Sequence, residues 1–270
     1  MSSLPPGLSD GSRGSAPAMT RLVTHVVVAV PARNEEDLIE RCLESVDRAA
    51  RRIHQPVTVV VAADSCRDAT AARARRAPLA ASLQVVEGTW RSAGGARRAG
   101  VATALGIMDT IEPGGVWLAH TDADCVVPAD WLERQLRHAH RGHDAVAGIV
   151  TLDPASTDPG VFAAFGGVYA ADGAAHRHVH GANLGVRADA YLAGGGWSRR
   201  TVIGEDHRLW RRLGEVGAMR VQPTDVTVTT SSRAHGRVRG GFSANLRRLA
   251  GPARADMDIA RDGYASVVCD

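Results

Sequence analysis

The chain has 270 residues, 44% of them apolar, which is enough for one large domain or two small ones with a substantial core. All 32 basic residues are arginine, yet the formal net charge is only +3. The sequence therefore lacks the strong positive charge that predicts a nucleic-acid partner. Its longest apolar run is far shorter than the roughly 20 residues that span a bilayer, so we expect no integral membrane segment.

Two further features indicate the class of protein. The cysteines are far apart and form no paired motif, which argues against a zinc knuckle or a disulfide framework: Cys42, Cys66, Cys125 and Cys269. Residues 1–20 have neither a basic start nor an apolar segment, so they predict a flexible tail rather than a secretion signal. We therefore expect a globular cytoplasmic protein with reduced thiols.

The first hundred residues after this tail predict alternating strands and helices. Residues 23–30 form a continuous β-branched run, typical of a strand buried on both faces. Apolar residues then recur at helical spacing over 38–46, behind three acids that suit the start of a helix. The pattern repeats, with strands expected at 56–65, 83–88 and 116–124 and helices at 68–77 and 94–108. Such alternation predicts an α/β fold with a mostly parallel central sheet flanked by helices.

The second half has a less regular pattern and contains no internal repeat. We expect strands at 144–150 and 225–233, helices at 160–175 and 204–217, and a strand, a loop and a short helix over 176–197. His176, His178 and His180 alternate within the last segment, so an extended chain would place them on one face. A three-histidine metal site is one interpretation of that spacing.

Polar residues follow the predicted strands where the strands end: Asn34 and Glu35, then Asp64, then Asp122 and Asp124. In parallel α/β sheets, ligands bind beyond the carboxyl ends of the strands. Asp122 and Asp124 are two residues apart, so in a strand their carboxylates can be presented together. A hard cation such as Mg²⁺ or Mn²⁺, bridging them to a diphosphate, would relieve their repulsion. The pair alone would also suit a surface loop, but its place at the end of a buried strand favours a cation site.

Five motifs in this order resemble the family 2 glycosyltransferases. They are "VVVAVPARNEEDLIERCLESV", "VVVAADSCRDAT", "GGARRAG", "TDADCVVPADWL" and "GEDHRLWRRL", within roughly residues 23–245. The resemblance implies a GT-A fold, which is Rossmann-like and typical of nucleotide-diphospho-sugar transferases. It also implies a nucleotide-sugar co-substrate, a divalent metal (Mg²⁺ or Mn²⁺), and transfer with inversion. We expect a UDP-sugar donor and a small, soluble hydroxyl acceptor, and we leave a homodimer open.

The resemblance also suggests how the chain is divided. Residues 21–125 would form a nucleotide-sugar-binding half and residues 126–245 an acceptor-binding and catalytic half, followed by a C-terminal helical tail at 246–270. The Gln-x-x-Arg-Trp motif frequent in the family is absent, as are its membrane-spanning segments. This departure favours a single transfer over processive polysaccharide synthesis.

A nucleotide-binding set follows from the same resemblance: Pro31, Ala32, Arg33, Asn34, Glu35, Asp64, Arg97 and Asp122. Asp64 matches the acid that holds the base, and Glu35 lies near the ribose or base. Arg97 matches a basic position near the phosphates, at the start of a helix whose N-terminus would itself favour an anion. Alternatively, Arg97 and Arg98 belong to an exposed helix face, and Glu35 merely complements the helix dipole.

The remaining carried-over residues concern the metal, the base and the acceptor. Asp124 matches the metal-binding acid, with Asp122 nearer the ribose and phosphates, and His235 is either a further metal ligand or an exposed loop histidine. Asp206 matches the general base and Glu205 is the second candidate, although both could be ordinary first-turn acids. The residues expected to contact the sugar or the acceptor are His180, Gly181, Ala182, Asn183, Arg233 and Arg237.

Three other functions remain open. A retaining GT-A transferase of the glucosyl-3-phosphoglycerate synthase kind would share the donor half. A nucleotide-sugar-binding protein without catalysis would also share it, although the intact Asp122, Asp124 and Asp206 argue against this. A nucleotidyltransferase would carry a glycine-rich loop near its start, and "VPARNEE" is not such a loop.

Overall fold

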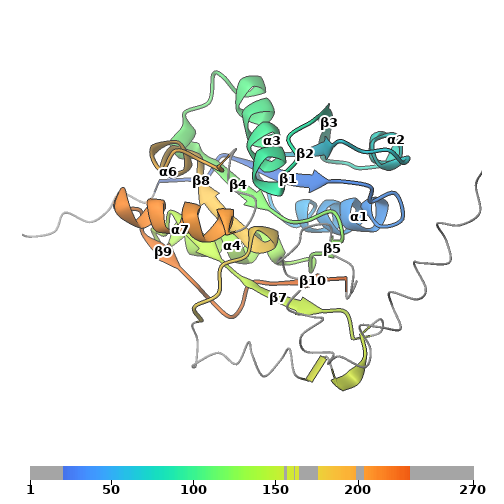
Figure 1. Ribbon diagram of the computed structural model, residues 1–270. Coiled ribbons are helices and arrows are strands. Elements are labelled where there is room, and N and C mark those ends of the chain that lie inside the picture. The colour runs from blue at the N-terminus through green and yellow to red at the C-terminus, as the bar shows by residue number, and fades with distance from the viewer. Residues whose placement is uncertain (1–20, 155–156, 161, 164–175, 199–203, 232–270) are drawn as a thin grey trace, which may run out of the picture.

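The computed structural model describes residues 21–154, 157–160, 162–163, 176–198 and 204–231. A seven-stranded sheet in the order β3-β2-β1-β4-β8-β6-β9 forms its centre (Figure 1). The strands are β1 (His25–Ala32), β2 (Val57–Asp64), β3 (Ser82–Gly88), β4 (Val116–His120), β6 (Ala145–Ala147), β8 (Leu184–Arg187) and β9 (Arg220–Val221). The first four are mutually parallel, and β8 runs antiparallel to both of its neighbours. The mostly parallel sheet predicted from the sequence is confirmed.

A second sheet of three strands, in the order β5-β10-β7, lies below the central sheet in Figure 1. Its strands are β5 (Cys125–Val126), β7 (Ile149–Leu152) and β10 (Thr227–Thr230). The strand predicted at 144–150 is in fact two strands, because the chain leaves the central sheet at Gly148 and continues into the small one. A side chain at Gly148 would collide with the Asn183 amide and the Val226 carbonyl, so the crossing requires glycine.

The helices cover both faces of the central sheet. Helices α1 (Ile39–Ala50), α2 (Thr70–Arg76) and α4 (Trp131–His140) pack on one face, and α3 (Ala93–Ile107), α6 (Ala188–Ala193) and α7 (Glu205–Glu215) pack on the other. Because strand side chains alternate, Val26, Val28 and Val30 of β1 join the first core while Val27 and Ala29 join the second. The described residues also include two short 3₁₀ helices, η1 (Pro113–Gly115) and η2 (Gly181–Asn183).

The structure departs from the predicted elements at further places. Helix α4 was missed, and β4 ends at His120, four residues before the predicted end. Residues 176–180 form no strand, although a strand was predicted there. The imidazoles of His176, His178 and His180 nevertheless lie together and stack, with ring centroids 5.9 and 6.1 Å apart. Most of the helix predicted at 160–175 lies outside the described residues. No helix in the described part of the chain is long and apolar enough to cross a bilayer.

Candidate active site

The carboxyl ends of β1 and β4 meet where the strand order of the sheet reverses. β2 and β3 extend the sheet on one side of β1, and the chain then returns to place β4 on the other side. A crevice that can receive a ligand is expected beyond such a reversal. Pro31 fits here although it is a strand residue, because the pairing with β4 has already ended at Ala29 and His120.

The loop after β1 is fastened to the loop after β2. The backbone N–H of Arg67 donates to Asn34 Oδ1 (2.8 Å), and Asn34 itself takes a left-handed conformation with φ of 52°. The backbone N–H of Glu35 donates to Thr70 Oγ1 at 2.7 Å. These contacts between 33–36 and 66–70 give the crevice one ordered wall, which contains the predicted nucleotide-binding residues that follow Pro31.

Asp64 is buried at the end of β2, with 4% of its surface exposed. Its Oδ1 accepts hydrogen bonds from the backbone N–H groups of Trp90 (2.8 Å) and Arg91 (2.9 Å) and from the hydroxyl of Ser65 (3.0 Å). Asp64 therefore holds the turn that leads from β3 into α3. Ser92 then caps α3 by accepting from the N–H of Gly95 at 3.0 Å.

Arg97 lies at the centre of the site and is 3% exposed. Its guanidinium forms ion pairs with Asp122 and, at 3.4 Å, with Glu205. Burial disfavours the charge, but these two carboxylates outweigh burial and raise the pKa of Arg97. An added side chain at Gly181 would approach the guanidinium to 2.6 Å. The interpretation of Arg97 as part of an exposed helix face is therefore wrong.

Arg98 is likewise used within the fold. It donates to the carbonyl oxygens of Gly195 (2.8 Å) and Trp197 (3.0 Å), across from α3 to the segment before α7. The two consecutive arginines of the "GGARRAG" motif thus have different tasks. Arg97 neutralises acids of the site, and Arg98 ties down the chain beside it.

Asp122 and Asp124 follow the end of β4 rather than lying within it, so strand alternation does not govern them. Asp122 faces Arg97, while Asp124 Oδ2 accepts a hydrogen bond from the Ser231 hydroxyl at 3.0 Å. Burial raises the pKa of Asp122, and the negative charges of Asp124 and Asp206 raise it further against the opposing effect of Arg97. A cluster of carboxylates that repel one another in this way is suited to a cation.

The donor groups present fit a hard divalent ion that takes further ligands from its substrate. The two carboxylates offer only oxygen atoms as ligands, and Mg²⁺ and Mn²⁺ prefer oxygen ligands. Phosphate or water oxygens commonly occupy the remaining coordination positions of such ions. Within the residues that the structure describes, no group of three His, Cys, Asp or Glu residues is arranged to hold a metal, and this includes the three stacked histidines. His235, Arg233 and Arg237 lie outside the described residues.

The acids at the start of α7 approach the same site from the opposite side. Asp206 Oδ2 accepts a hydrogen bond from the N–H of Gly181 at 3.2 Å, and Oδ1 accepts from the N–H of His207 at 2.8 Å. The Glu205 side chain is 13% exposed, and burial raises its pKa against the lowering effect of Arg97. Arg97 thus joins an acid that follows β4 to an acid of α7, 83 residues later in the chain.

The predicted sugar and acceptor residues of the 180–183 loop divide into two groups. His180 and Gly181 border the site, and burial lowers the pKa of His180 to about 4. Ala182 packs partly against the core. Asn183 is completely buried: its Nδ2 donates to the carbonyls of Ile149 (2.8 Å) and Val226 (3.0 Å), and its Oδ1 accepts from the Trp131 indole (2.9 Å). Asn183 therefore has a structural role and is not available to line an acceptor site.

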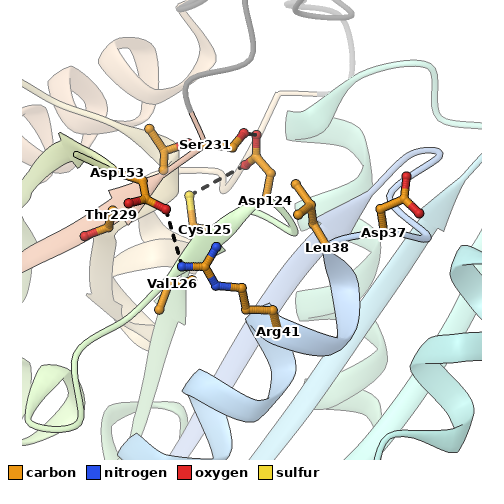
Figure 2. A pocket seen from close by; sticks show the side chains of 10 residues that line it. Asp37, Leu38, Arg41, Asp124, Cys125, Val126, Asp153, Thr229 and Ser231 are labelled. Atoms are coloured by element: carbon orange, nitrogen blue, oxygen red, sulfur yellow. Dashed lines mark hydrogen bonds and ion pairs between the residues drawn. The ribbon is translucent and has the colours of Figure 1, made fainter. Parts of the chain in front are cut away.

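A cavity of about 330 Å³ adjoins Asp124 on the side of α1. Figure 2 shows Arg41 reaching from α1 towards Asp153, with 3.4 Å between Arg41 Nη2 and Asp153 Oδ2. The lining residues are Asp37, Leu38, Arg41, Asp124, Cys125, Val126, Asp153, Thr229, Thr230 and Ser231. The sequence analysis missed this cavity because its walls come from four separate segments of the chain.

The sequence analysis also missed a buried pair beside Arg97. The indole N–H of Trp197 donates to His120 Nε2 at 2.9 Å, and His120 Nδ1 lies 3.1 Å from the Leu184 carbonyl oxygen. Burial lowers the pKa of His120 to about 3, so the ring is neutral and donates from Nδ1. The "GGGW" sequence is the one local signal of an unusual turn that delivers a large side chain to the interior.

Comparisons with known proteins agree with this geometry. The family model described as glycosyl transferase family 2 matches residues 27–167. The chain is similar to S. aureus TarS 1–349 solved with UDP-GlcNAc, at 14% identity and a TM-score of 0.60, over 83% of this chain and 65% of that one. It is also similar to the mannosyltransferase PcManGT from Pyrobaculum calidifontis, solved with GDP-Man and Mn²⁺, at 21% identity and a TM-score of 0.55, over 78% and 58% of the two chains. Comparison with curated proteins gave no match.

The solved structures establish the fold, and the family model establishes the family. The chain spans about three fifths of the length of the solved chains, and at these identities the likeness shows the GT-A fold alone. The family model covers more than half of the present sequence, including the loop after β1 and both acids that follow β4. By fold and by sequence, the chain belongs to glycosyl transferase family 2.

Proposed function

We propose that the chain transfers a sugar from a nucleoside-diphosphate donor, specifically a UDP-sugar, to a hydroxyl group of a small acceptor, with inversion at the anomeric carbon. The observation that carries the proposal is the position of Arg97, which pairs with Asp122 on the donor side and with Glu205 on the helix that would supply the base. Residues 21–125 would then bind the donor, and the second half would receive the acceptor.

On the donor side, we assign the nucleoside to the wall formed by residues 31–35 and to Asp64, and the diphosphate to Asp122 and Asp124. Asp64 would accept from the base through Oδ2, since its hydrogen bonds to Trp90, Arg91 and Ser65 are accepted by Oδ1. A divalent ion held by these two acids would neutralise the charge that builds on the departing diphosphate. Arg97 supplies a fixed positive charge behind Asp122. Because Arg97 is buried, we propose that it positions Asp122 rather than contacting the phosphates.

On the acceptor side, the proposal assigns the general base to Asp206. Glu205 is mostly buried and paired with Arg97, whereas Asp206 is half-buried and is oriented by N–H groups of Gly181 and His207. A carboxylate oxygen of Asp206 would take the proton of the attacking hydroxyl as the new C–O bond forms. The bond to the diphosphate breaks at the same centre, and its electron pair leaves with the diphosphate.

The donor site is tested by calorimetric titration with UDP and with GDP, each with Mn²⁺ and with EDTA. Asp124→Asn should abolish the metal-dependent part of binding, because the amide removes one anionic ligand. Asp130→Asn is the matched control, since Asp130 pairs with Arg134 on α4 at the surface. Failure of the wild-type protein to bind either nucleotide under any of these conditions would refute the donor assignment.

The base is tested by kinetics. Asp206→Asn should lower kcat by about 10²- to 10⁴-fold, the usual contribution of general-base catalysis, with little change in the Kd for the nucleotide. Glu205→Gln should instead impair both, because it leaves the buried Arg97 with one partner fewer. NMR of the anomeric proton of the product separates inversion from retention, and a retained configuration would contradict the role given to Asp206.

A further inference from the structure

The structure assigns a positioning role to the buried pair Trp197–His120: it holds the Arg97 guanidinium in the orientation that fixes Asp122 and Glu205. This inference rests on the proposed donor site and deepens it. Neither Trp197 nor His120 reaches the crevice, since both are completely buried. They would act on nucleotide binding only through Arg97.

The backbone at Trp197 is fixed on both sides. Gly195 and Gly196 take left-handed conformations, with φ of 76° and 66°, and so turn the chain inward after α6. The N–H of Trp197 donates to the Tyr191 hydroxyl at 3.1 Å, and its carbonyl accepts from Arg98. This turn places the indole in the core beside α3. The contacts that hold it there are all made within the protein chain.

The orientation of the indole ring is set by His120. The two rings meet edge to face, with centroids 5.2 Å apart and an interplanar angle of 75°, and the indole N–H donates to His120 Nε2. His120 lies at the end of β4, and its other nitrogen faces the Leu184 carbonyl of β8. The position of the indole is thus fixed, through His120, relative to two strands of the central sheet, β4 and β8.

Arg97 depends on this ring. Its Cζ lies 5.0 Å from the centre of the Trp197 ring, a cation–π distance. Among the described residues, Nε of Arg97 has no hydrogen-bond partner. Two carboxylates and one aromatic face therefore define the plane of the guanidinium. If the indole shifts, the guanidinium can rotate, and Asp122, two residues beyond His120, loses its fixed partner.

The test uses UDP affinity in the presence of Mn²⁺, measured by calorimetry, together with thermal unfolding. Trp197→Phe removes the N–H donor and shrinks the ring, and we expect it to weaken metal-dependent UDP binding by about tenfold, as is typical when a group that orients metal ligands is lost. Trp117→Phe is the matched control. Trp117 is also completely buried and donates one indole hydrogen bond, to Gln135 of α4 at 2.8 Å, but it belongs to the core on the other face of the central sheet. The control should lose a comparable amount of thermal stability and less than about twofold in UDP affinity.

A double-mutant cycle separates positioning from general destabilisation. In an Arg97→Lys background, Trp197→Phe should weaken UDP binding by less than about twofold further, because the group through which it acts is gone. Full additivity would overturn the inference. If Trp197→Phe does not fold, His120→Ala replaces it in the double-mutant cycle with Arg97→Lys. His120→Ala should likewise weaken UDP binding by less than about twofold in the Arg97→Lys background.

The outcomes also separate the two proposals. If the wild-type protein binds UDP with Mn²⁺ but Trp197→Phe binds it as tightly as Trp117→Phe does, the positioning role is wrong and the proposed donor site stands. If the wild-type protein binds neither UDP nor GDP with Mn²⁺, both are refuted. If it binds GDP alone, the choice of UDP is wrong, and the same cycle measured with GDP decides the positioning role.

Discussion

Replacement of Asn183 by alanine tests whether this residue lines a ligand site or holds the fold together. The amide joins three segments that are distant in the sequence. It contacts Ile149 at the start of β7, Val226 just before β10, and the Trp131 indole at the start of α4. All three hydrogen bonds are 2.8–3.0 Å long, and the side chain has no exposed surface. Asn183→Ala should therefore act on stability rather than directly on acceptor binding.

The magnitude follows from the groups left behind. The Trp131 N–H and the Ile149 carbonyl would lose the amide as a partner in the interior, where each unsatisfied group costs about 1–3 kcal/mol. The Val226 carbonyl would keep the hydrogen bond that it accepts from the N–H of Ile149 at 2.8 Å. Water entering the vacated space would offset part of this cost, so we expect a loss of about 3–5 kcal/mol in the free energy of unfolding. For a chain of this size that corresponds to a fall in Tm of roughly 10 °C.

The assay is urea denaturation of the wild-type and Asn183→Ala proteins, followed by tryptophan fluorescence. Gln222→Ala is the control: Gln222 Nε2 donates a single hydrogen bond, to the His178 carbonyl at 3.1 Å, in a half-buried place. This control should lose about 1 kcal/mol or less. A loss below about 1 kcal/mol for Asn183→Ala, accompanied by a raised KM for the acceptor, would refute the structural assignment and restore the ligand-lining one.

Two further substitutions test local features. Burial alone would raise the pKa of Asp47, but hydrogen bonds from the N–H groups of Ala81 and Ala80 and the ion pair with Arg51 lower it. Its stabilising effect is therefore fully present above the ordinary pKa of about 3.9 and is lost as the pH falls through the lowered value. The stability difference between wild type and Asp47→Asn, measured in urea between pH 7 and pH 3.5, should shrink below about pH 4; a constant difference would contradict this. Gly196→Ala should cost about 1–3 kcal/mol by thermal unfolding, because φ is 66° and the new methyl group would approach the Tyr191 ring to 2.7 Å; an unchanged Tm would show that the turn adapts.

Features that depend on the local order of residues could be predicted before the structure was known. Each of the patterns used extends over only about ten to fifteen residues: the buried β-branched runs, the helical spacing of apolar residues and the acids at helix starts. The alternating α/β order and the parallel sheet could therefore be predicted. The same holds for the acid that ends β2 and the acids that follow β4, since the change from apolar to polar residues marks the end of a strand to within a few residues. The motif order also identified the family, which the family model confirms.

The role of each polar residue, in contrast, depends on contacts between segments that are distant in the sequence. Nothing near Asn183 in the sequence shows that its amide will meet Ile149 and Val226, and nothing near Arg97 shows that two acids will surround it in the interior. The indole of Trp197 reaches His120 across 77 positions. Such contacts depend on which strands become neighbours, and the antiparallel insertion of β8 beside β4 brings these segments together. A polar side chain is free for a ligand only where the fold has not already used its hydrogen bonds, and that balance is set by long-range packing.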